Sequence, residues 1–290
     1  MSEMPFVDTH VHYYDLKDPD LCYSWLQPDF VHPIIGDIDG IKAQRYDANT
    51  YIAEARFSNV TKCVHVQAAL GIKDPVKETE WLEAMAKRTG FPHAMVAHSD
   101  LARPDIGDEL GRHMAASSRL RGIRDFGQGD YLVDPAWRRG CAALATHGLL
   151  LGLDTIWENM GKAKDLAAEV PDLIILVDHA GFPRSRTEEY FTHWSAAMSD
   201  LAEADNVYCK ISGLGMCDQR WTIESIRPWV LYCLEAFGVE RCVMGTNWPV
   251  DRLFSSYDPV VNAYTEIIKD FSKAEQEALF FRNAETLFRI

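Results

Sequence analysis

The sequence lacks several features that would place it in a common class of protein. It has no C-x-x-C pair, and its seven cysteines are scattered and odd in number. Cysteines in apolar runs behave as small hydrophobic side chains, so we expect neither a disulfide framework nor a cysteine-based zinc site. No stretch approaches the roughly 20 apolar residues of a membrane span, and no apolar signal segment follows the first methionine. These absences favour a cytoplasmic protein.

The chain also lacks an excess of positive charge. Its 290 residues carry a formal net charge of −14 at pH 7. This balance argues against nucleic acid or an anionic membrane as the main partner, and we expect a small-molecule substrate instead. No G-x-G-x-x-G or G-K-[ST] loop follows an apolar run, which weakens a nucleotide-binding interpretation.

Eight short apolar runs are present, each followed by a loop and an amphipathic segment. Near-continuous apolar strands that alternate with helices predict a parallel sheet covered on both faces. Eight such units in one chain favour a closed (β/α)₈ TIM barrel over an open doubly wound sheet, which is the alternative. The expected strands are Phe6–Val11, Cys63–Ala68, Ala94–Ala97, Leu120–Ile123, Leu149–Leu153, Leu173–Val177, Val207–Ile211 and Cys242–Met244.

Two segments depart from the simple repeat. Residues 13–47 separate the first strand from its helix, and their aromatic content predicts an enlarged first βα loop that folds over the catalytic end. The segment Lys273–Leu287 predicts an extra C-terminal helix. Because no linker or low-complexity tract interrupts the pattern, we expect residues 1–290 to form a single domain.

The first strand ends in Asp8-Thr9-His10-Val11-His12. Residues i and i+2 of a strand point to the same face, so His10 and His12 can address one ion or one substrate. Histidine is the commonest metal ligand and titrates near neutral pH, which suggests chemistry at this position. The alternative is that a short strand carries two histidines by chance.

Polar residues also end other runs, at the barrel end where active sites lie. On the second strand, Gln67 is a stronger site candidate than His65, because a lone histidine within a strand is usually a satisfied core residue. On the fourth strand, Arg124 can bind a carboxylate or a lactone carbonyl through its planar guanidinium. An ion pair between Arg124 and Asp125 is the alternative.

The sixth and seventh strands carry further charged residues. The sixth switches abruptly from apolar residues to Asp178-His179. A buried polar group without a partner is unfavourable, so a functional site is the economical explanation. Lys210 lies within the seventh strand and must pair with a carboxylate or with an anionic substrate.

With these segments in order, the chain resembles the amidohydrolase superfamily, in its branch of sugar lactonases and pyrone-dicarboxylate lactonases. The resemblance covers the whole chain, and its motifs occur in the expected strand order. They are D-T-H-V-H (8–12), V-Q-A (66–68), G-I-R (122–124), D-H-A-G-F-P (178–183), C-K-I-S-G-L (209–214) and G-T-N-W-P-V-D (245–251).

The resemblance implies roles for individual residues. His10 and His12 match the pair that binds a divalent metal, or the substrate where metal is absent. His179 matches the histidine that completes the metal site or polarises the lactone carbonyl, and Arg124 matches a substrate-binding arginine. Three imidazoles suffice for one catalytic zinc ion. They can equally serve as hydrogen-bond donors to a substrate carboxylate, so a metal-free site stays open.

One departure from the family concerns the proton acceptor. The usual aspartate on the eighth strand is replaced by Asn247, whose amide cannot accept a proton at neutral pH. Hydrolysis of a small sugar-acid or dicarboxylate-type lactone is the main prediction, with Asp251, Asp178 or His179 as the base. No lysine lies on the fourth strand to be carboxylated, so we expect no binuclear metal site.

Two alternatives to hydrolysis follow from the same residues. A metal-independent sugar-acid lactone isomerase would use a substrate hydroxyl as nucleophile, oriented by Asn247, and intramolecular attack needs a weaker base. A metal-dependent decarboxylase is the other alternative. Substrate contacts are expected from Arg124, Gln67 and Lys210. Trp25 and Trp248 are expected to stack on a sugar face or to cover an aromatic-derived lactone, which would place the enzyme in carbohydrate metabolism or near it.

Overall fold

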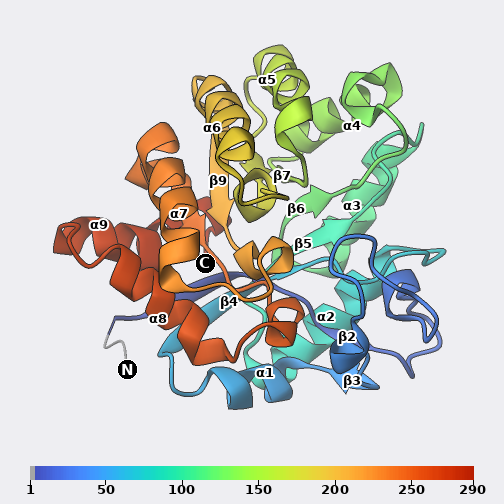
Figure 1. Cartoon of the computed structure of the whole chain (residues 1–290). Helices are drawn as coiled ribbons and strands as arrows, with labels where there is room; N and C mark the ends of the chain where they lie inside the picture. The colour runs from blue at the N-terminus through green and yellow to red at the C-terminus, as the bar shows by residue number, and fades with distance from the viewer. Residues whose placement is uncertain (1–3) are drawn as a thin grey trace.

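The computed structural model describes residues 4–290. Eight parallel strands follow one another in chain order around the molecule (Figure 1). The predicted (β/α)₈ barrel is therefore confirmed. The strands are β1 (Phe6–Val11), β4 (Val60–Val66), β5 (Ala94–His98), β6 (Leu120–Arg124), β7 (Leu150–Leu153), β8 (Ile175–Val177), β9 (Val207–Ile211) and β10 (Cys242–Met244).

Helices surround the strands at the expected places in the chain. Each main helix presents its apolar positions to the sheet, as its 3.6-residue period requires. They are α1 (Ala48–Ala55), α2 (Val76–Thr89), α3 (Ile106–Ala116), α4 (Pro135–Thr146), α5 (Met160–Glu169), α6 (Glu188–Ala202), α7 (Ile223–Phe237) and α8 (Tyr257–Ile267). Within residues 4–290, no helix is long and apolar enough to cross a membrane.

The first and last strands are joined by a short seam. Val11 pairs with Trp248 as an isolated parallel bridge, and the His12 backbone N–H donates to the Trp248 carbonyl at 2.8 Å. Buried Asp8 reinforces the seam, because its carboxylate accepts from the backbone and the hydroxyl of Thr246 at 2.9 and 2.6 Å. The hydroxyl of Tyr257 also donates to Asp8 at 2.8 Å. Asp8 thus closes the barrel rather than facing its interior.

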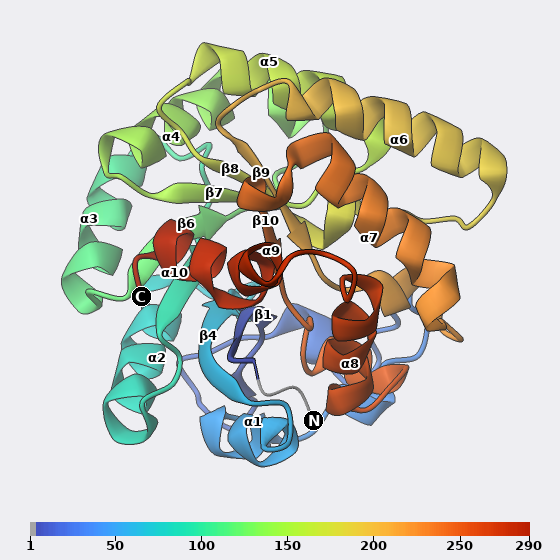
Figure 2. The same ribbon diagram turned by 90° about the vertical axis from the view of Figure 1, so that its left-hand side faces the viewer.

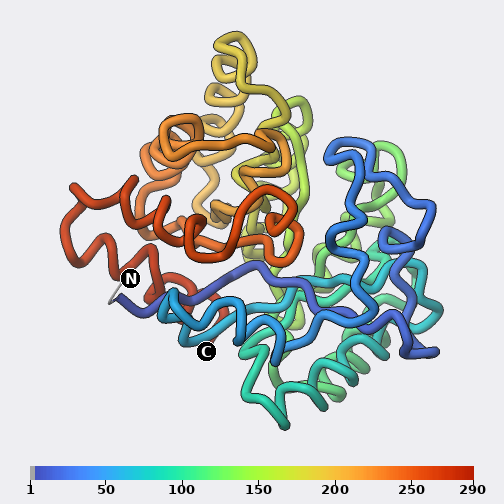
Figure 3. The backbone as a smooth tube through the Cα atoms, turned by 60° about the horizontal axis from the view of Figure 1, so that its bottom comes forward, coloured from blue at the N-terminus to red at the C-terminus, as the bar shows by residue number. Residues whose placement is uncertain are grey.

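Residues 13–47 form the predicted enlarged first loop. Its two ends pair as antiparallel strands, β2 (Tyr14–Asp15) and β3 (Arg45–Tyr46), so the loop leaves the barrel and returns to it at neighbouring positions. Figure 3 shows this excursion in blue at the side of the barrel. The indole N–H of Trp25 donates to the Ala68 carbonyl at 2.7 Å, which fixes the loop to the end of β4.

The C-terminal segment closes the opposite end of the barrel. Helix α9 (Lys273–Glu277) continues through a π-helical turn (Ala278–Arg282) into α10 (Asn283–Phe288), which confirms the extra helix. Figure 2 shows this segment crossing the barrel beside β1 and β10. Phe288 is completely buried and belongs to the cluster of apolar side chains that fills this end, together with Val7, Val64 and Val243. The carboxyl ends of the strands lie at the other side of this cluster.

Candidate active site

A cavity of about 560 Å³ lies at the carboxyl ends of the strands, under residues 13–47. This is the end at which barrel enzymes carry their active sites. Strand ends supply its polar floor, and the enlarged first loop supplies much of its apolar wall. The polar floor contains His12, Gln67, Arg124, Asp154, His179 and Asn247.

His10 and His12 lie on β1 with their Nε2 atoms 3.1 Å apart. His12 Nδ1 lies 2.9 Å from the Val66 carbonyl, which can only accept, so Nδ1 carries the proton and Nε2 holds a lone pair. If His10 donates from Nε2, its buried Nδ1 has no partner and lies 3.9 Å from an Asp178 oxygen. If His10 donates from Nδ1, two lone pairs face each other. A cation between the two Nε2 atoms would remove this conflict.

His179 follows β8 in a turn of unusual backbone. His179, Ala180, Gly181 and Phe182 all have positive φ, between 46° and 65°. His179 Nδ1 lies 3.0 Å from the Ser212 hydroxyl, and Nε2 lies 3.5 Å from Arg124 Nη2, which can only donate. Nε2 therefore carries the lone pair and Nδ1–H donates to Ser212. Non-glycine residues in this conformation are strained, which is typical of functional sites.

All three histidines are neutral near pH 7. Burial lowers the pKa of His12 and of His179 to about 3, and lowers the pKa of His10 well below its usual value. The positive charge of Arg124 acts in the same direction on each. Neutral imidazoles with inward Nε2 lone pairs can bind a metal ion or accept a hydrogen bond. His12 and His179 are thus poorly suited to donate to a substrate carboxylate, the alternative that the sequence left open.

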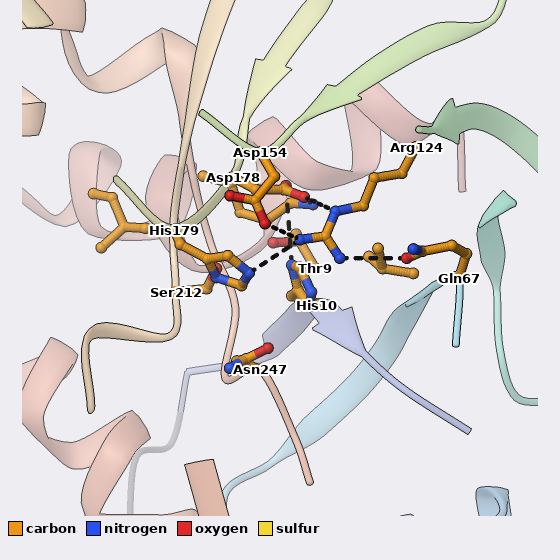
Figure 4. A network of polar contacts seen from close by, with 12 residues as sticks. Thr9, His10, Gln67, Arg124, Asp154, Asp178, His179, Ser212 and Asn247 are labelled. Atoms are coloured by element: carbon orange, nitrogen blue, oxygen red, sulfur yellow. Dashed lines mark hydrogen bonds and ion pairs between the residues drawn. The ribbon is translucent and has the colours of Figure 1, made fainter. Parts of the chain in front are cut away.

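Arg124 lies at the centre of the polar network (Figure 4). Its Nη2 donates to Asp154 at 2.8 Å, its Nε lies 2.9 Å from Asp178, and its Nη1 donates to Gln67 at 3.3 Å. The alternative pairing with Asp125 is wrong, because Asp125 points away from the cavity. It accepts instead from the indole of Trp137 at 3.0 Å.

Asp178 is ionised although it is completely buried. Burial alone would raise its pKa, but the ammonium of Lys210, 2.8 Å away, and the guanidinium of Arg124 bring the pKa below its usual value. Lys210 meets the expectation that a lysine within a strand needs a carboxylate. It does not line the cavity, so we expect it to hold Asp178 in place rather than to contact a substrate.

Asp154 is a site residue that the sequence analysis missed. It follows β7 directly, lines the cavity, and its side chain is 23% exposed there. Burial raises its pKa, while Arg124 opposes that rise. Its only signal in the sequence is a single polar residue after a leucine-rich run. Of the carboxylates near the floor, Asp154 is the one on the cavity wall, whereas Asp178 and Asp251 lie behind it.

Asn247 and Asp251 form a buried pair. Asn247 Nδ2 donates to Asp251 Oδ2 at 2.7 Å, which turns the amide oxygen away from Asp251. Burial raises the pKa of Asp251 to about 7, although the hydrogen bonds from Asn247 and from the Gly215 backbone act to lower it. Asn247 lines the cavity and Asp251 does not. Asp251 can therefore orient Asn247, but it does not face the space in which a water molecule would react.

The remaining candidates divide between cavity and core. Trp25 lines the cavity, with its ring centroid 6.1 Å from that of His12. Trp248 is buried, and its indole donates to Glu54 at 2.5 Å, so it packs behind the site. His65 is buried as well: it accepts from the Tyr13 backbone and lies 3.3 Å from Glu78. It is a core histidine, as the sequence suggested, and does not line the cavity.

The donor set fits a single divalent cation. In residues 4–290, one group of side chains brings three potential ligand atoms within 4.8 Å of one another: His10, Asp178 and His179. Both oxygens of Asp178 are already engaged by Lys210 and Arg124. His12 lies outside this group, but its Nε2 is 3.1 Å from His10 Nε2, and the conflict between these two imidazoles is the feature that a cation would resolve.

The barrel and the polar cavity at its strand ends have the architecture of a (β/α)₈ enzyme. The sequence profile of the amidohydrolase family matches residues 7–290, and the chain belongs to this family. An uncharacterised protein of Sinorhizobium fredii, y4mH, is 38% identical over 302 aligned residues that cover both chains completely. An L-fucono-1,5-lactonase of Burkholderia ambifaria is 29% identical, covering 85% of this chain and 81% of the lactonase.

A solved structure agrees with the fold. The crystal structure of an amidohydrolase from Burkholderia multivorans with bound zinc has a TM-score of 0.84, at 24% identity. The match covers 98% of this chain and 99% of that one. The resemblance to lactone-processing amidohydrolases is therefore confirmed at the level of the family.

Proposed function

We propose that this enzyme hydrolyses a small lactone at the carboxyl end of its barrel. One observation carries the proposal: a single cavity brings together a partly exposed carboxylate, an arginine and the neutral imidazoles of His12 and His179, with His10 buried directly beside His12. Hydrolysis of a cyclic ester needs a proton acceptor for water and a donor for the carbonyl oxygen. The lactonase from Burkholderia ambifaria, as a relative along most of the chain, supports the same reaction class.

Asp154 is the proposed proton acceptor in place of the usual aspartate on the last strand. Its Oδ2 accepts from Arg124, which leaves Oδ1 for a water molecule. The water oxygen bonds to the carbonyl carbon while its proton passes to Asp154. The ring C–O bond then breaks, and the proton returns to the ring oxygen to give the hydroxy acid. Arg124 keeps one Nη1 N–H to orient the carbonyl oxygen.

We propose that a divalent metal, with zinc as the first candidate, is held by His10, His12 and His179. When bound, such an ion polarises a carbonyl oxygen and lowers the pKa of water to about 7. The second nitrogens of His12 and His179 are already fixed by Val66 and Ser212, as is usual for metal-binding histidines. Ion content of the purified protein tests this assignment: one equivalent is expected, and its loss in His12→Asn.

The reaction is tested with a panel of γ- and δ-lactones in ¹⁸O-labelled water. Hydrolysis places one label in the product carboxylate and releases one proton, which a pH-stat records. Conversion to an isomeric lactone, without label and without proton release, would instead indicate isomerisation, and release of CO₂ from carboxylated substrates would indicate decarboxylation. Absence of any ring opening across the panel would contradict lactone hydrolysis.

Lactone isomerisation is the second candidate, and Asn247 is the observation that favours it. An amide held by Asp251 can orient a substrate hydroxyl but cannot activate water. The replacement Asn247→Asp tests this candidate. A gain of hydrolysis at the expense of isomerised product would support isomerisation as the native reaction.

A further inference from the structure

The cavity divides into two regions of different chemistry. Its floor is polar, whereas the wall above it is mainly apolar, with a few polar side chains such as Ser24, Asn159 and Arg184 among residues of separate segments. Residues 13–47 contribute one part of this wall, and the loops after β6, β7 and β8 contribute another. Among the apolar wall residues are Trp25, Phe30, Ile34, Phe126, Ile156 and Phe182.

Several of these wall residues remain partly exposed, although each is large and apolar. Phe126 is 41% exposed, and Trp25, Phe30, Ile34 and Ile156 are half-buried. Exposed apolar side chains gathered in a concave site are typical of a ligand-binding surface. Trp25 is fixed by its hydrogen bond to Ala68, so its ring is a preorganised surface.

The polar floor offers few free groups to a substrate with many hydroxyls. Arg124 already donates hydrogen bonds to Asp154 and Gln67 and forms an ion pair with Asp178. Asn247 Nδ2 already donates a hydrogen bond to Asp251. Above the floor, polar side chains such as Ser24, Asn159 and Arg184 are interspersed among a larger number of apolar ones. A polyhydroxylated sugar lactone that filled the cavity would place several of its hydroxyls against apolar side chains, where they would have no hydrogen-bond partner, and this is unfavourable.

We infer that the natural substrate is a lactone carrying an apolar alkyl or aryl substituent, rather than a polyhydroxylated sugar lactone. The inference rests on the proposed lactone chemistry for the position of the ring. The ring lies on the polar floor, and the substituent lies against Trp25, Ile34 and Phe126. A cavity of about 560 Å³ is in the range that encloses drug-sized ligands, and so has room for both parts.

The first test compares kcat/KM across δ-lactones whose alkyl substituent grows from hydrogen to hexyl, together with a phenyl-substituted δ-lactone and hexonolactones. Each buried methylene is expected to raise kcat/KM by about fourfold until the wall is covered. The hexonolactones are expected to fall at or below the unsubstituted ring. Highest activity on hexonolactones, or no dependence on chain length, would overturn the inference.

Two matched variants test whether the dependence of kcat/KM on substituent length arises at the cavity wall. Phe126 and Phe57 are both exposed phenylalanines, at 41% and 51%, and each has an arginine over its ring. Only Phe126 lines the cavity. Phe126→Ser should therefore reduce the ratio of kcat/KM for hexyl to unsubstituted lactone by about tenfold, and Phe57→Ser should leave that ratio unchanged. Equal ratios in the two variants would contradict the proposed wall.

A binding measurement separates this inference from the proposed reaction. Lactams with the same substituents lack the ester bond, and calorimetry reports their affinity without turnover. Affinity that rises with chain length, even if no lactone is opened, would support the apolar wall and reject only the reaction. Affinity independent of the substituent would reject the apolar wall whatever the reaction is.

Discussion

At the scale of single residues, the carboxylates around the cavity occupy different environments. Asp178 is held ionised by two cations, Asp251 is buried behind Asn247, and Asp154 reaches the cavity. Environments that push carboxyl pKa values apart commonly separate their chemical roles. Here they separate a structural anion, an orienting group and a candidate base.

Asp154→Asn should lower kcat by about 10²- to 10⁴-fold, the usual contribution of a general base. In the unmodified enzyme, activity should fall as the pH drops through the pKa of Asp154, because only the ionised form accepts a proton. Burial raises this pKa above its usual value of 3.8, so the acid limb lies above pH 3.8. The pH profile of the variant should lack this limb. Asp130→Asn, at an exposed carboxylate paired with Lys162, is the control.

Asp251 should make folding stability depend on pH. Its pKa is raised from 3.8 to about 7, so its contribution is fully present below pH 3.8 and is lost as the pH rises through 7. Asp251→Asn removes this dependence. Between pH 4 and 8, the free energy of unfolding of the unmodified protein should fall relative to the variant, by at most about 4 kcal/mol. Urea denaturation at both pH values measures this change, and parallel curves would contradict it.

At the scale of elements, the turn after β9 packs closely against the turn after β8 that carries His179. Gly213 has φ +61°, and a Cβ there would lie 2.5 Å from His179 Nδ1. Gly213→Ala should therefore displace His179 from Ser212 and lower kcat/KM by about 10- to 100-fold. Gly148→Ala is a matched control, because Gly148 has φ +65° with open space around its Cβ. Equal loss of activity in both variants would indicate general backbone strain.

The C-terminal helix should stabilise the barrel without affecting catalysis. Phe288 is buried at the end opposite the cavity, so Phe288→Ala should reduce the free energy of unfolding by about 3–5 kcal/mol. At 25 °C the folded variant should keep the kcat/KM of the unmodified enzyme. Chemical denaturation and a kinetic assay check both parts, with Arg282→Ala as the surface control. A large change in kcat/KM would show that this helix also controls the site.

The elements were predictable from the sequence because each strand is a short apolar run and each helix an amphipathic one. The side-chain contacts between different strands were harder to predict from the sequence. Asp125 follows Arg124 in sequence, but successive strand residues point to opposite faces. The real partners are Asp154, after the neighbouring strand β7, and Asp178, after β8, one strand further along the sheet. Asp154 itself belongs to none of the motifs that carry the family resemblance, and only the folded barrel places it beside the others.

At the scale of the whole molecule, the net charge of −14 should affect which substrates reach the cavity. A lactone bearing a carboxylate is repelled at low ionic strength, whereas a neutral lactone is not. Raising salt from 0.01 to about 0.3 M shortens the Debye length several-fold. It should increase kcat/KM for the charged lactone by on the order of tenfold at most, and leave the neutral one unchanged. A decrease for the charged lactone would indicate that local cations such as Arg124 dominate.

The seam between β1 and β10 has a consequence for biosynthesis. Strand β10 and the helix that fills the barrel beneath it emerge from the ribosome after the other seven strands. Until they emerge, β1 has one unpaired edge, and the apolar cluster around Val7 and Val243 stays open. The growing polypeptide therefore cannot complete its fold residue by residue. One edge of β1 stays unpaired until the segment that carries β10 and α10 has emerged.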